Sequence, residues 1–483
     1  MKRSFLFASA ASFAISVSAL HLPFARQAAA RTSGILSKRN PTIFAQSGSL
    51  GLDNTLNNVY SSSITINGKN VPVNLDTGST DFWLYDYEPG LLDNAQVYSN
   101  LELTLRYGRG GVTGNIGQTN VEFAGFSVAN QSFLYVTSQN QTSIIENKSA
   151  AGLLGLGFDT LSDINRLVAQ TFSGATWGRS LLSNIFLSDL STPNHIAFRL
   201  DRLYDGNDTD TGSFDIGTFA SGLEAVNGTA EIPVFSSSPS QNIYWTVLVD
   251  GFAVNGKNQT LQTTITNGTV PPDGKVAAVL DTGYSLPQLR PELAAAIYEP
   301  LGGVFDTDSA MYVVPCEAQT NVTFYIGGRT IPIHPLDLTF VLATPVNGQN
   351  MTICFGAFQP FSSEAGGGLT DLILGDAFLR NTYTVYDFGD FINGTSGDRR
   401  QDPYVKLLPL TDPGAASTEF QSARKSYLDT LPPQLNVSTL SSGNPQAIPG
   451  SGSSGSNGAM RFGMNVRIAF LATTLVVGAT NWF

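Results

Sequence analysis

The sequence predicts an all-β (mainly β) protein built from two similar halves. The triplet Asp-Thr-Gly occurs twice, as Asp76-Thr77-Gly78 and Asp281-Thr282-Gly283, and each copy follows an apolar run typical of a strand. A segment rich in leucine and glycine follows each triplet at a similar spacing and ends at Gly155 or Gly375. Only 13% of the residues are charged, and 48 glycines favour many short strands joined by turns. An internal duplication of a strand-rich unit explains this pattern.

The two apolar runs, residues 71–75 and 276–280, place each aspartate where a strand enters a tight turn. One such triplet alone is ordinary turn chemistry. Two matched triplets instead predict a single site with one aspartate from each half. Two carboxyl groups held side by side share a proton, so that one can act as a base and the other as an acid at acidic pH. Such a pair can direct water at an amide carbonyl.

Composition excludes several classes of function. The formal charge of −12 and the lack of a basic cluster argue against nucleic acid as a partner. The three histidines, His21, His195 and His334, are scattered and form neither a metal-ligand pattern nor a Ser-His-Asp arrangement. We therefore expect no metal and no cofactor.

The amino end is typical of an exported protein. Lys2-Arg3 and the apolar stretch that follows predict a signal peptide over residues 1–19. Residues 20–39 then form a short propeptide that ends at the dibasic pair Lys38-Arg39; two solvated basic residues in a flexible leader are the alternative. Eleven Asn-X-Ser/Thr sequons agree with passage through a glycosylating compartment: Asn130, Asn140, Asn147, Asn207, Asn227, Asn258, Asn267, Asn321, Asn350, Asn393 and Asn436.

The carboxyl end changes composition after about Leu410. Residues 411–458 are rich in Ser, Gly, Pro and Asn, which predicts a flexible stalk. Residues 459–483 end in an apolar tail, and small residues followed by a spacer and such a tail are the signal for a glycolipid (GPI) anchor. A membrane span is the competing interpretation, because the tail is just long enough to cross a bilayer.

The chain has two cysteines, Cys316 and Cys354. An exported chain with two cysteines most often joins them, so we expect a structural disulfide rather than a catalytic thiol or a metal site. In the chain-entropy picture a loop of this length contributes about 3 to 4 kcal/mol.

From about Val59 to Leu410 the chain resembles the pepsin-like aspartic proteases. The segment 76–83, Asp-Thr-Gly-Ser-Thr-Asp-Phe-Trp, follows the family's first active-site motif, and the segment 103–114 resembles the hairpin flap that closes over substrate. Further matches are the segments 244–247 and 373–380. The resemblance implies a bilobal fold in which two pseudo-symmetric β-barrel-like lobes, residues 40–228 and 229–410, flank a cleft.

The resemblance also implies a role for individual residues. Asp76 and Asp281 are the catalytic acids, and Tyr107 is the flap tyrosine with Trp83 as its hydrogen-bond partner. Cys316 and Cys354 fit the disulfide of the carboxyl-terminal lobe. Substrates are polypeptides, and a monomer is favoured because one chain supplies both acids. The residues expected to support the dyad are Thr77, Gly78, Ser79, Thr282, Gly283 and Ser285, and those expected to bind substrate are Trp83, Tyr107, Gly108 and Arg109.

Two positions depart from the family pattern. The second triplet is followed by Tyr284, where the family usually has a small hydroxyl residue that hydrogen-bonds the catalytic acid. Either another group supports Asp281, or the pKa of Asp281 and the catalytic rate differ from those of the family. Arg109 stands at a flap position often held by a small polar residue; a solvated flap arginine is weighed there against a role in specificity.

The anchored terminus and the dibasic leader are similar to fungal, glycolipid-anchored, yapsin-like members of the family. The leading hypothesis is thus a secreted aspartic endopeptidase, held at the plasma membrane or cell wall and active at acidic pH. The alternative is a bilobal peptide-binding or cell-surface interaction protein with weak or no turnover. A third hypothesis, a carbohydrate-binding wall module, gives no reason for two aligned Asp-Thr-Gly loops.

Overall fold

A computed structural model describes residues 48–440, except 56–58, 108–109, 141, 143, 146–147, 204–211, 238–243, 308, 347 and 362–367. The predicted signal peptide, propeptide and carboxyl-terminal tail therefore lie outside the described residues. The flap residues Gly108 and Arg109 do so as well.

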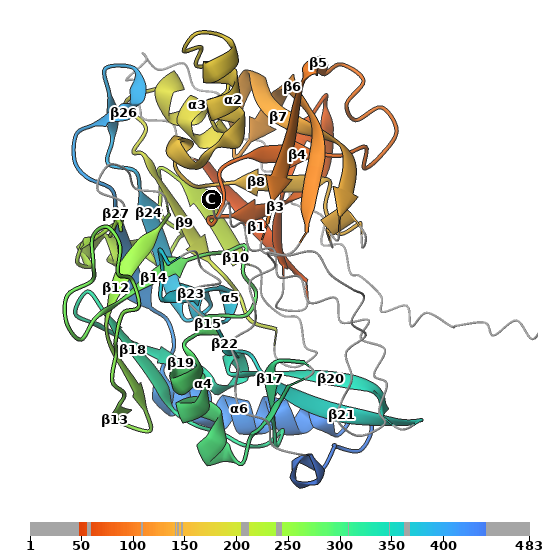
Figure 1. The fold of residues 1–483 in the computed structure, drawn as a ribbon, viewed down its shortest axis with the longest axis vertical. Coiled ribbons are helices and arrows are strands. Elements are labelled where there is room, and N and C mark those ends of the chain that lie inside the picture. The colour runs from red at the N-terminus through yellow and green to blue at the C-terminus, as the bar shows by residue number, and fades with distance from the viewer. Residues whose placement is uncertain are drawn as a thin grey trace, which may run out of the picture. The chain divides into compact units, whose positions relative to one another are not determined.

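The chain is mainly β, as the sequence predicts (Figure 1). The largest sheet has the strand order β11-β27-β24-β9-β10-β1-β2-β3-β8-β4-β7-β6-β5. Its strands are β1 (Gly48–Thr55), β2 (Val59–Ile66), β3 (Lys69–Asp76), β4 (Phe82–Leu84), β5 (Gln96–Arg106), β6 (Gly111–Phe123), β7 (Phe126–Asn140), β8 (Gly152–Gly155), β9 (His195–Arg199), β10 (Gly212–Ile216), β11 (Ile232–Pro233), β24 (Thr382–Asp387) and β27 (Tyr404–Pro409).

The second half of the chain supplies three further sheets. One has the order β19-β18-β12-β14-β23-β15-β22, with β13 beside β12; another has the order β16-β17-β21-β20; the last pairs β25 with β26. Their strands are β12 (Thr246–Val254), β13 (Lys257–Asn258), β14 (Val276–Leu280), β15 (Gln288–Leu289), β16 (Val304–Asp306), β17 (Met311–Val314), β18 (Val322–Ile326), β19 (Arg329–Ile333), β20 (Thr339–Val346), β21 (Gln349–Gly356), β22 (Gln359–Pro360), β23 (Leu372–Leu374), β25 (Phe391–Ile392) and β26 (Thr395–Arg399).

Helices are short and few among the described residues. The α-helices are α2 (Asp163–Thr171), α3 (Leu181–Ser188), α4 (Pro291–Tyr298), α5 (Asp376–Leu379) and α6 (Pro413–Leu428). The 3-10 turns are η1 (Asp159–Leu161), η2 (Glu224–Gly228), η3 (Glu299–Leu301), η4 (Pro335–Asp337) and η5 (Val437–Thr439). In the described part of the chain, none of these helices is long and apolar enough to cross a bilayer.

The two halves repeat the same strand pairing around their triplets. Strand β3, which ends at Asp76, pairs in parallel with β8, and Asp76 lies opposite Gly155. Strand β14, which ends just before Asp281, pairs in parallel with β23, and Leu280 lies opposite Leu374. All five residues of β14 are buried, as expected for a strand covered on both faces. The duplication inferred from the sequence is therefore visible in the fold.

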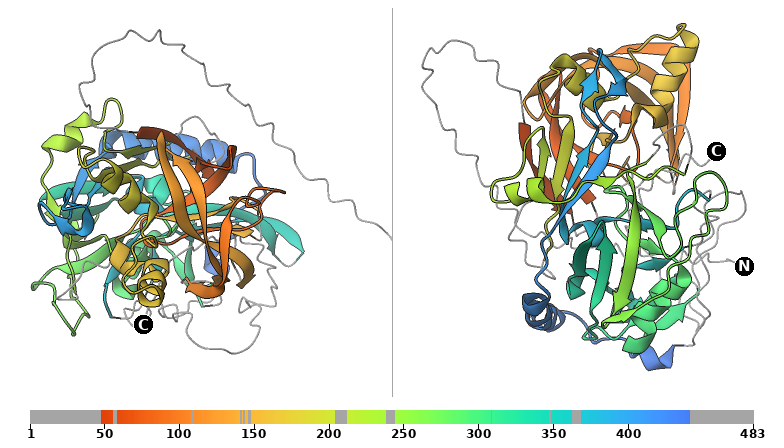
Figure 2. Two further views of the ribbon diagram at one scale, coloured as in Figure 1. Left: turned by 90° about the horizontal axis from the view of Figure 1, so that it is seen from above. Right: turned by 90° about the vertical axis from the view of Figure 1, so that its left-hand side faces the viewer.

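The division at residues 228 and 229 does not separate the strands of the two halves. Strand β24 pairs antiparallel with β9 along residues 383–387, and β27 continues the same sheet on its other side. Figures 1 and 2 show these blue strands from late in the chain beside the yellow-green strands β9 and β10. The aromatic core also crosses the division, because the rings of Phe158 and Trp245 lie 4.3 Å apart.

Residues 413–440 belong to the folded part of the protein, so the stalk predicted to begin at residue 411 is wrong at its start. Helix α6 buries Phe420, Arg424 and Leu428 along one face. Further on, the backbone of residues 432–435 runs beside β21: Thr352 N–H donates to the Pro433 carbonyl at 2.9 Å, and Leu435 N–H donates to the Thr352 carbonyl at 2.8 Å. We call residues 413–440 the carboxyl-terminal strap.

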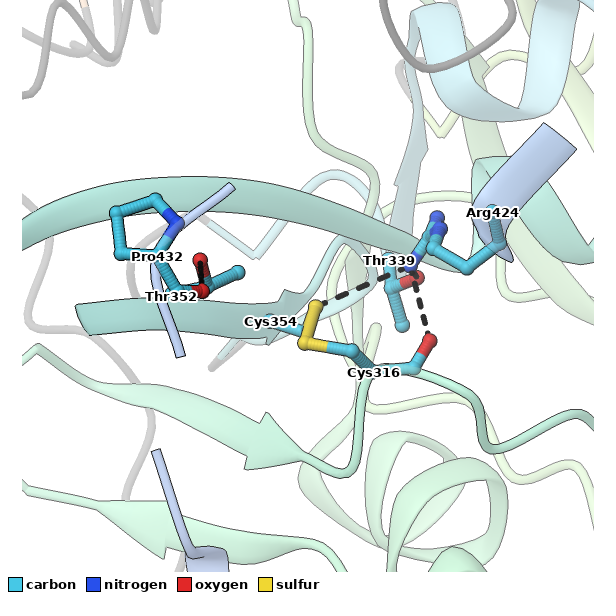
Figure 3. The surroundings of a disulfide bond; sticks show 6 residues. All are labelled: Cys316, Thr339, Thr352, Cys354, Arg424 and Pro432. Atoms are coloured by element: carbon cyan, nitrogen blue, oxygen red, sulfur yellow. Dashed lines mark hydrogen bonds between the residues drawn. A yellow bond between two sulfur atoms is a disulfide. The ribbon is translucent and has the colours of Figure 1, made fainter. Parts of the chain in front are cut away.

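The strap also covers the disulfide. From α6, the Arg424 guanidinium reaches the Cys316 carbonyl at 3.3 Å and the Thr339 hydroxyl at 2.9 Å (Figure 3). The expected bond between Cys316 and Cys354 is present. Val437 completes a small apolar core with Met311, Val313, Ile353 and Phe355. The strap thus supplies both polar and apolar contacts to the four-stranded sheet.

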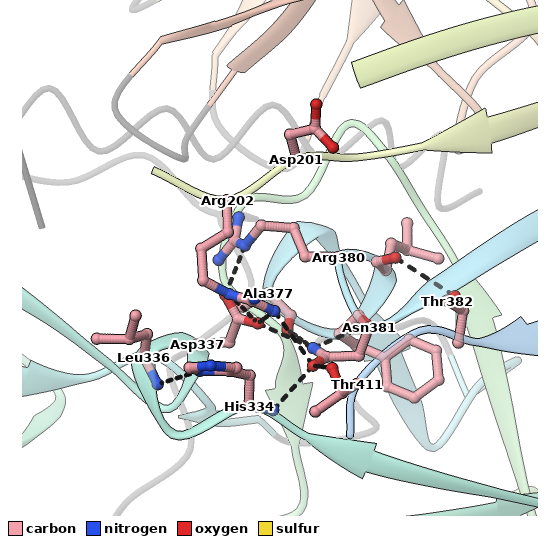
Figure 4. Close-up of polar contacts among 12 residues, drawn as sticks. Asp201, Arg202, His334, Leu336, Asp337, Ala377, Arg380, Asn381, Thr382 and Thr411 are labelled. Carbon is pink, nitrogen blue, oxygen red and sulfur yellow. Dashed lines mark hydrogen bonds and ion pairs between the residues drawn. The ribbon is translucent and has the colours of Figure 1, made fainter. Parts of the chain in front are cut away.

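A buried ionic cluster joins segments that are far apart in the sequence (Figure 4). Asp337 of η4 accepts hydrogen bonds from Arg202, which follows β9, and from Arg380, whose Nε lies at 2.6 Å. These two guanidinium groups hold the pKa of Asp337 well below its usual range. Asn381 Nδ2 donates to the same carboxylate at 3.0 Å. The cluster therefore ties the end of β9 to the second half of the chain.

Candidate active site

The two triplet loops lock together through their threonines. Thr77 N–H donates to the hydroxyl of Thr282 at 3.1 Å, and Thr282 N–H donates to the hydroxyl of Thr77 at 3.0 Å. Each hydroxyl in turn donates to a carbonyl of the other loop, Leu280 or Leu75, at 2.9 Å. This symmetric set of buried hydrogen bonds fixes the distance between the two strand ends and so brings the two aspartates together.

The carboxyl groups of Asp76 and Asp281 are buried, and each influences the pKa of the other. Each also accepts an amide hydrogen from the glycine of its own triplet, from Gly78 at 2.8 Å and from Gly283 at 2.7 Å. A β-carbon on Gly78 would lie 2.2 Å from Asp281 Oδ2, which no real structure tolerates. Glycine is therefore required at position 78 for the carboxyl pair to form.

The pair is asymmetric. The Ser79 hydroxyl donates to Asp76 Oδ2 at 2.5 Å and favours the ionised form of Asp76. Burial raises the pKa of Asp281 well above its usual value, and the adjacent Asp76 carboxyl raises it further. Burial also raises the pKa of Asp76, but its hydrogen bonds to Ser79, Gly78 and Asp281 oppose that rise. Burial thus favours the protonated form of both carboxyls, and the Ser79 hydroxyl is a donor that stabilises the charge of Asp76.

A pocket lies beside Asp76 beneath the hairpin formed by β5 and β6. Its floor is the segment Gly78–Asp81, and its roof is Leu105–Tyr107 at the end of β5; Leu161 and Tyr244 complete the lining. The hairpin closes through a hydrogen bond from Tyr107 N–H to the Gly110 carbonyl at 3.1 Å. This places the expected flap tyrosine over the loop that bears Asp76.

Trp83 lies beside Tyr107 as expected, in the same apolar cluster. Burial raises the pKa of Tyr107 well above its usual value, and an interaction with the Trp83 side chain moderates the rise. Neither the Tyr107 hydroxyl nor the Trp83 indole nitrogen, however, meets the geometry of a good hydrogen bond. The two side chains are thus neighbours, but the expected hydrogen bond between them is not formed.

Six pocket residues were not among the predicted site residues: Thr80, Asp81, Leu105, Arg106, Leu161 and Tyr244. Asp81 lies within the first motif, but its role there is to receive the amino end of α2: the Ser162 hydroxyl donates to it at 2.5 Å and Asp163 N–H at 2.9 Å. Burial raises the pKa of Asp81 to about 6. The only sequence signal for Tyr244 is the resemblance of residues 244–247 to the pepsin-like aspartic proteases. Its nearness to both aspartates became evident only from the fold.

After the first triplet, the Ser79 side chain contacts the aspartate; after the second triplet, Tyr284 and Ser285 contact helix α5 through their backbone. Tyr284 is buried, and its carbonyl oxygen accepts the Asp376 amide hydrogen at 2.7 Å. Ser285 is also buried, and its carbonyl oxygen accepts the Ala377 amide hydrogen at 3.3 Å. Both residues therefore brace the Asp281 loop against α5 through their backbone. The disulfide, in contrast, lies with the strap and not at the carboxyl pair.

Comparisons with known proteins agree with this geometry. The chain is 26% identical to vacuolar protease A of Aspergillus fumigatus over 70% of its own length and 79% of that protein. It is also 26% identical to aspergillopepsin-1 of Aspergillus oryzae over 68% of this chain and 74% of the relative. The aspartic proteinase from Irpex lacteus has the same fold, with a TM-score of 0.55 at 18% identity over 77% of this chain and 100% of that structure.

The fold and the paired aspartates define an aspartic-type endopeptidase, a hydrolase of peptide bonds. The sequence profile of the eukaryotic aspartyl protease family matches residues 59–394. The chain belongs to that family.

The buried acids predict a protein that is more stable in mild acid than at neutral pH. Burial raises the pKa of both Asp81 and Asp387 to about 6, whereas an unfolded aspartate titrates near 4. The folded state therefore holds protons that the unfolded chain has lost, and stability falls as the pH rises from about 4 through 6. Each carboxyl contributes up to about 3 kcal/mol to this loss. The lowered pKa of Asp337 acts oppositely, and only below about pH 4.

Urea unfolding of the purified protein at pH 4.5 and pH 7 measures this difference. Asp387→Asn should reduce it, because the neutral amide needs no proton. Asp398→Asn, at an exposed position in β26, should leave it unchanged. A greater free energy of unfolding at pH 7 than at pH 4.5 would contradict the prediction.

Proposed function

We propose that the protein is an exported, cell-surface aspartic endopeptidase that acts at acidic pH with Asp76 and Asp281 as its catalytic pair. The observation that supports it most is the pair of buried carboxyls that the linked threonines bring together beside a hairpin-covered pocket. Peptide hydrolysis needs one base and one acid within reach of the same water and carbonyl. The pair provides both from one chain, which favours a monomer.

In the proposed mechanism, Asp76 is the base and Asp281 is the acid. Ionised Asp76 takes a proton from a substrate water held between the carboxyls, and the resulting hydroxide attacks the scissile carbonyl carbon. Asp281 donates its proton to the carbonyl oxygen, so a neutral tetrahedral intermediate forms. Collapse of this intermediate breaks the C–N bond, and the amine leaves with the proton held by Asp76 while the intermediate returns a proton to Asp281.

The supporting residues have separate tasks in this mechanism. Ser79 and the Gly78 amide stabilise the Asp76 carboxylate, and the Gly283 amide orients Asp281. Thr77 and Thr282 hold the two loops at a fixed separation, while Ser285 braces the second loop. Tyr107 and Trp83 support the hairpin roof under which a polypeptide substrate binds. The roles assigned by resemblance to Gly108 and Arg109 remain predictions.

The proposed cellular location rests on sequence signals and on exposure. The leader over residues 1–39 and the tail over residues 459–483 are the signals for export and for a GPI anchor. From these two signals we infer that the protein is yapsin-like and is held at the plasma membrane or cell wall by a glycolipid anchor. Every sequon asparagine within the described residues is exposed, as a glycan requires: Asn130, Asn140, Asn227, Asn258, Asn267, Asn321, Asn350, Asn393 and Asn436.

The alternative function is a peptide-binding or cell-surface interaction protein with weak turnover. Tyr284 favours it, because the family's usual hydroxyl beside the second catalytic acid is absent from that position. Digestion of an unfolded protein separates the two functions. We expect the purified protein to cleave it at pH 3 to 5, with a sharp decrease toward pH 7 as the proton on Asp281 is lost. Binding of peptides without cleavage at any of these pH values would favour the alternative.

The anchor is tested in cells. The full chain, expressed in a yeast host, should remain with the cell surface and be released by a phosphatidylinositol-specific phospholipase C. A chain that ends at Leu440 should enter the medium with its protease activity intact. Retention of that shortened chain at the surface would show that some other segment holds the protein there.

A further inference from the structure

The pocket beside Asp76 lies along the open edge of strand β5. Three successive residues, Leu105, Arg106 and Tyr107, line it. Successive side chains of a strand point to opposite faces, so three in a row can line one pocket only if the pocket lies at the strand's edge. Strand β5 is the last strand of the largest sheet and pairs only with β6 among the described residues, which leaves its other edge for the pocket.

The roof of the pocket brings a positive charge to this edge. Leu105 and Tyr107 are 2% and 8% exposed and belong to the apolar cluster around Trp83. Arg106, between them, lies on the opposite face of β5 and is exposed. Within the part of the chain that the structure describes, its guanidinium forms no ion pair. The charge of Arg106 is therefore open to a bound molecule.

The same pocket adjoins the group expected to activate water. Gly78 and Ser79 line its floor, and they donate to the two carboxylate oxygens of Asp76 at 2.8 Å and 2.5 Å. Residues of an extended peptide are about 3.3 Å apart, so a peptide whose scissile bond lies at the carboxyl pair has a side chain within a few residues of this pocket. The pocket is thus placed to receive a substrate side chain.

One acid shares the pocket with Arg106. Among the described residues that line it, Asp81 is the only other one with an ionisable charge at acidic or neutral pH. Its carboxyl group is buried and accepts hydrogen bonds from the Ser162 hydroxyl at 2.5 Å and from Asp163 N–H at 2.9 Å. Burial raises the pKa of Asp81 to about 6, so this carboxyl is mainly neutral in mild acid. The pocket then has a net positive charge.

The charged and titratable groups around the pocket do not cancel that charge. Asp163 of α2 is paired with Arg166, whose Nη2 lies 2.5 Å from its Oδ1. The phenols of Tyr107 and Tyr244 stay neutral, because burial raises the pKa of both. The carboxyl pair has a negative charge in its active form, but the two donors of the pocket floor are already directed at it.

We propose that Arg106 is a specificity-determining residue that selects polypeptides with an acidic side chain, aspartate or glutamate, in the pocket beneath the hairpin. The inference rests on the proposed endopeptidase function and adds a substrate class to it. A guanidinium binds a carboxylate through two parallel N–H···O hydrogen bonds, which neither a neutral amide nor a cation can replace. The favoured cleavage site therefore has an acidic residue close to the broken bond.

The preference should depend on pH in a way that packing against the arginine stem does not. A substrate glutamate ionises near about pH 4.3. The ratio of kcat/KM for a glutamate peptide to that for its glutamine twin should therefore rise between pH 3 and pH 5. It should fall again above pH 6, where Asp81 becomes charged. For a half-exposed pair of this kind we expect a maximum ratio of about three to ten.

The experiment is a cleavage-site profile of a diverse peptide pool at pH 5, followed by kcat/KM from pH 3 to pH 7 for peptide pairs that differ only by glutamate or glutamine. The wild type should select an acidic residue at one position near the cleaved bond. Arg106→Gln should bring the ratio at that position to about one at every pH. Arg106→Lys, which keeps the charge and loses the planar fork, should keep part of the preference.

Arg329→Gln is the matched control, because it makes the same exchange at a partly exposed arginine of β19, which does not line the pocket. Its ratio should equal that of the wild type. An acidic preference that survives in Arg106→Gln, or a wild type that selects no acidic residue at any position, would overturn the inference and leave the endopeptidase function standing.

Two further outcomes are distinguishable from these. If Arg106→Gln does not fold, the pH dependence of the ratio in the wild type and in Arg106→Lys decides, and a ratio that does not change with pH overturns the inference. A wild-type protein that cleaves no peptide of the pool would instead overturn the proposed function, and this inference with it.

Discussion

Asp281→Asn should lower kcat by about a thousandfold or more, because an amide at this position cannot hand a proton to the scissile carbonyl. Asp76→Asn should lose as much, since it removes the base that activates water. In both variants KM should change far less than kcat, because the pocket is lined mainly by residues 78–81 and by the hairpin, and not by either aspartate of the pair. Steady-state kinetics on one peptide from pH 3 to pH 7 measure both effects.

The stability of the same variants distinguishes lost chemistry from lost structure. Burial disfavours the charged forms of both carboxyls, so a neutral amide should make the folded protein more stable at pH 7 than the wild type. Asp250→Asn in β12, a partly exposed carboxylate paired with Lys275, provides a control that should keep its turnover. Wild-type kcat in either triplet variant would rule out the assigned catalytic pair.

Ending the chain after Leu410 should leave a protein that does not fold stably, whereas ending it after Leu440 should preserve stability and activity. The shorter chain loses the whole strap, including the buried side chains of Phe420 and Val437 and the hydrogen bonds to Thr352. Deleting one buried phenylalanine side chain alone costs about 3 to 5 kcal/mol, which is comparable with the whole stability of a domain.

Two point substitutions in α6 refine this test. Phe420→Ala should lower the free energy of unfolding by about 3 to 5 kcal/mol. Lys425→Ala, on the solvent side of the same helix, should have little effect, because its ion pair with Asp429 is exposed. Equal stability of the two truncated chains would show that the strap is dispensable.

The carboxyl pair could be predicted from the sequence because it depends on local pattern. Residues 71–78 alone predict a strand followed by a tight turn at a glycine. The duplication then predicts that the second Asp-Thr-Gly loop lies next to the first. The pairing of β24 with β9 could not be predicted, because these strands are nearly two hundred residues apart and no local pattern selects the partner of a strand. The placement of Tyr244 in the pocket depended on the same long-range folding.

The strap was missed for a different reason. Averaged composition over residues 411–458 is dominated by Ser, Gly and Pro, which hides one amphipathic helix. Its buried face, Ala416, Phe420, Arg424 and Leu428, follows the spacing of four residues that a helix requires. Arg424 interrupts that apolar stripe, and a charged residue is normally expected on the surface. Its burial depends on hydrogen-bond acceptors near the disulfide, which are brought close only by the fold.

The pairing of β24 with β9, and of β27 with β24, has a consequence for biosynthesis. While the ribosome is still producing residues up to about 409, β9 has no neighbour on one of its edges, and an open edge can pair with another chain. Neither half of the gene should therefore yield a soluble product by itself. A nascent polypeptide of this kind is expected to need chaperone protection until translation is nearly finished.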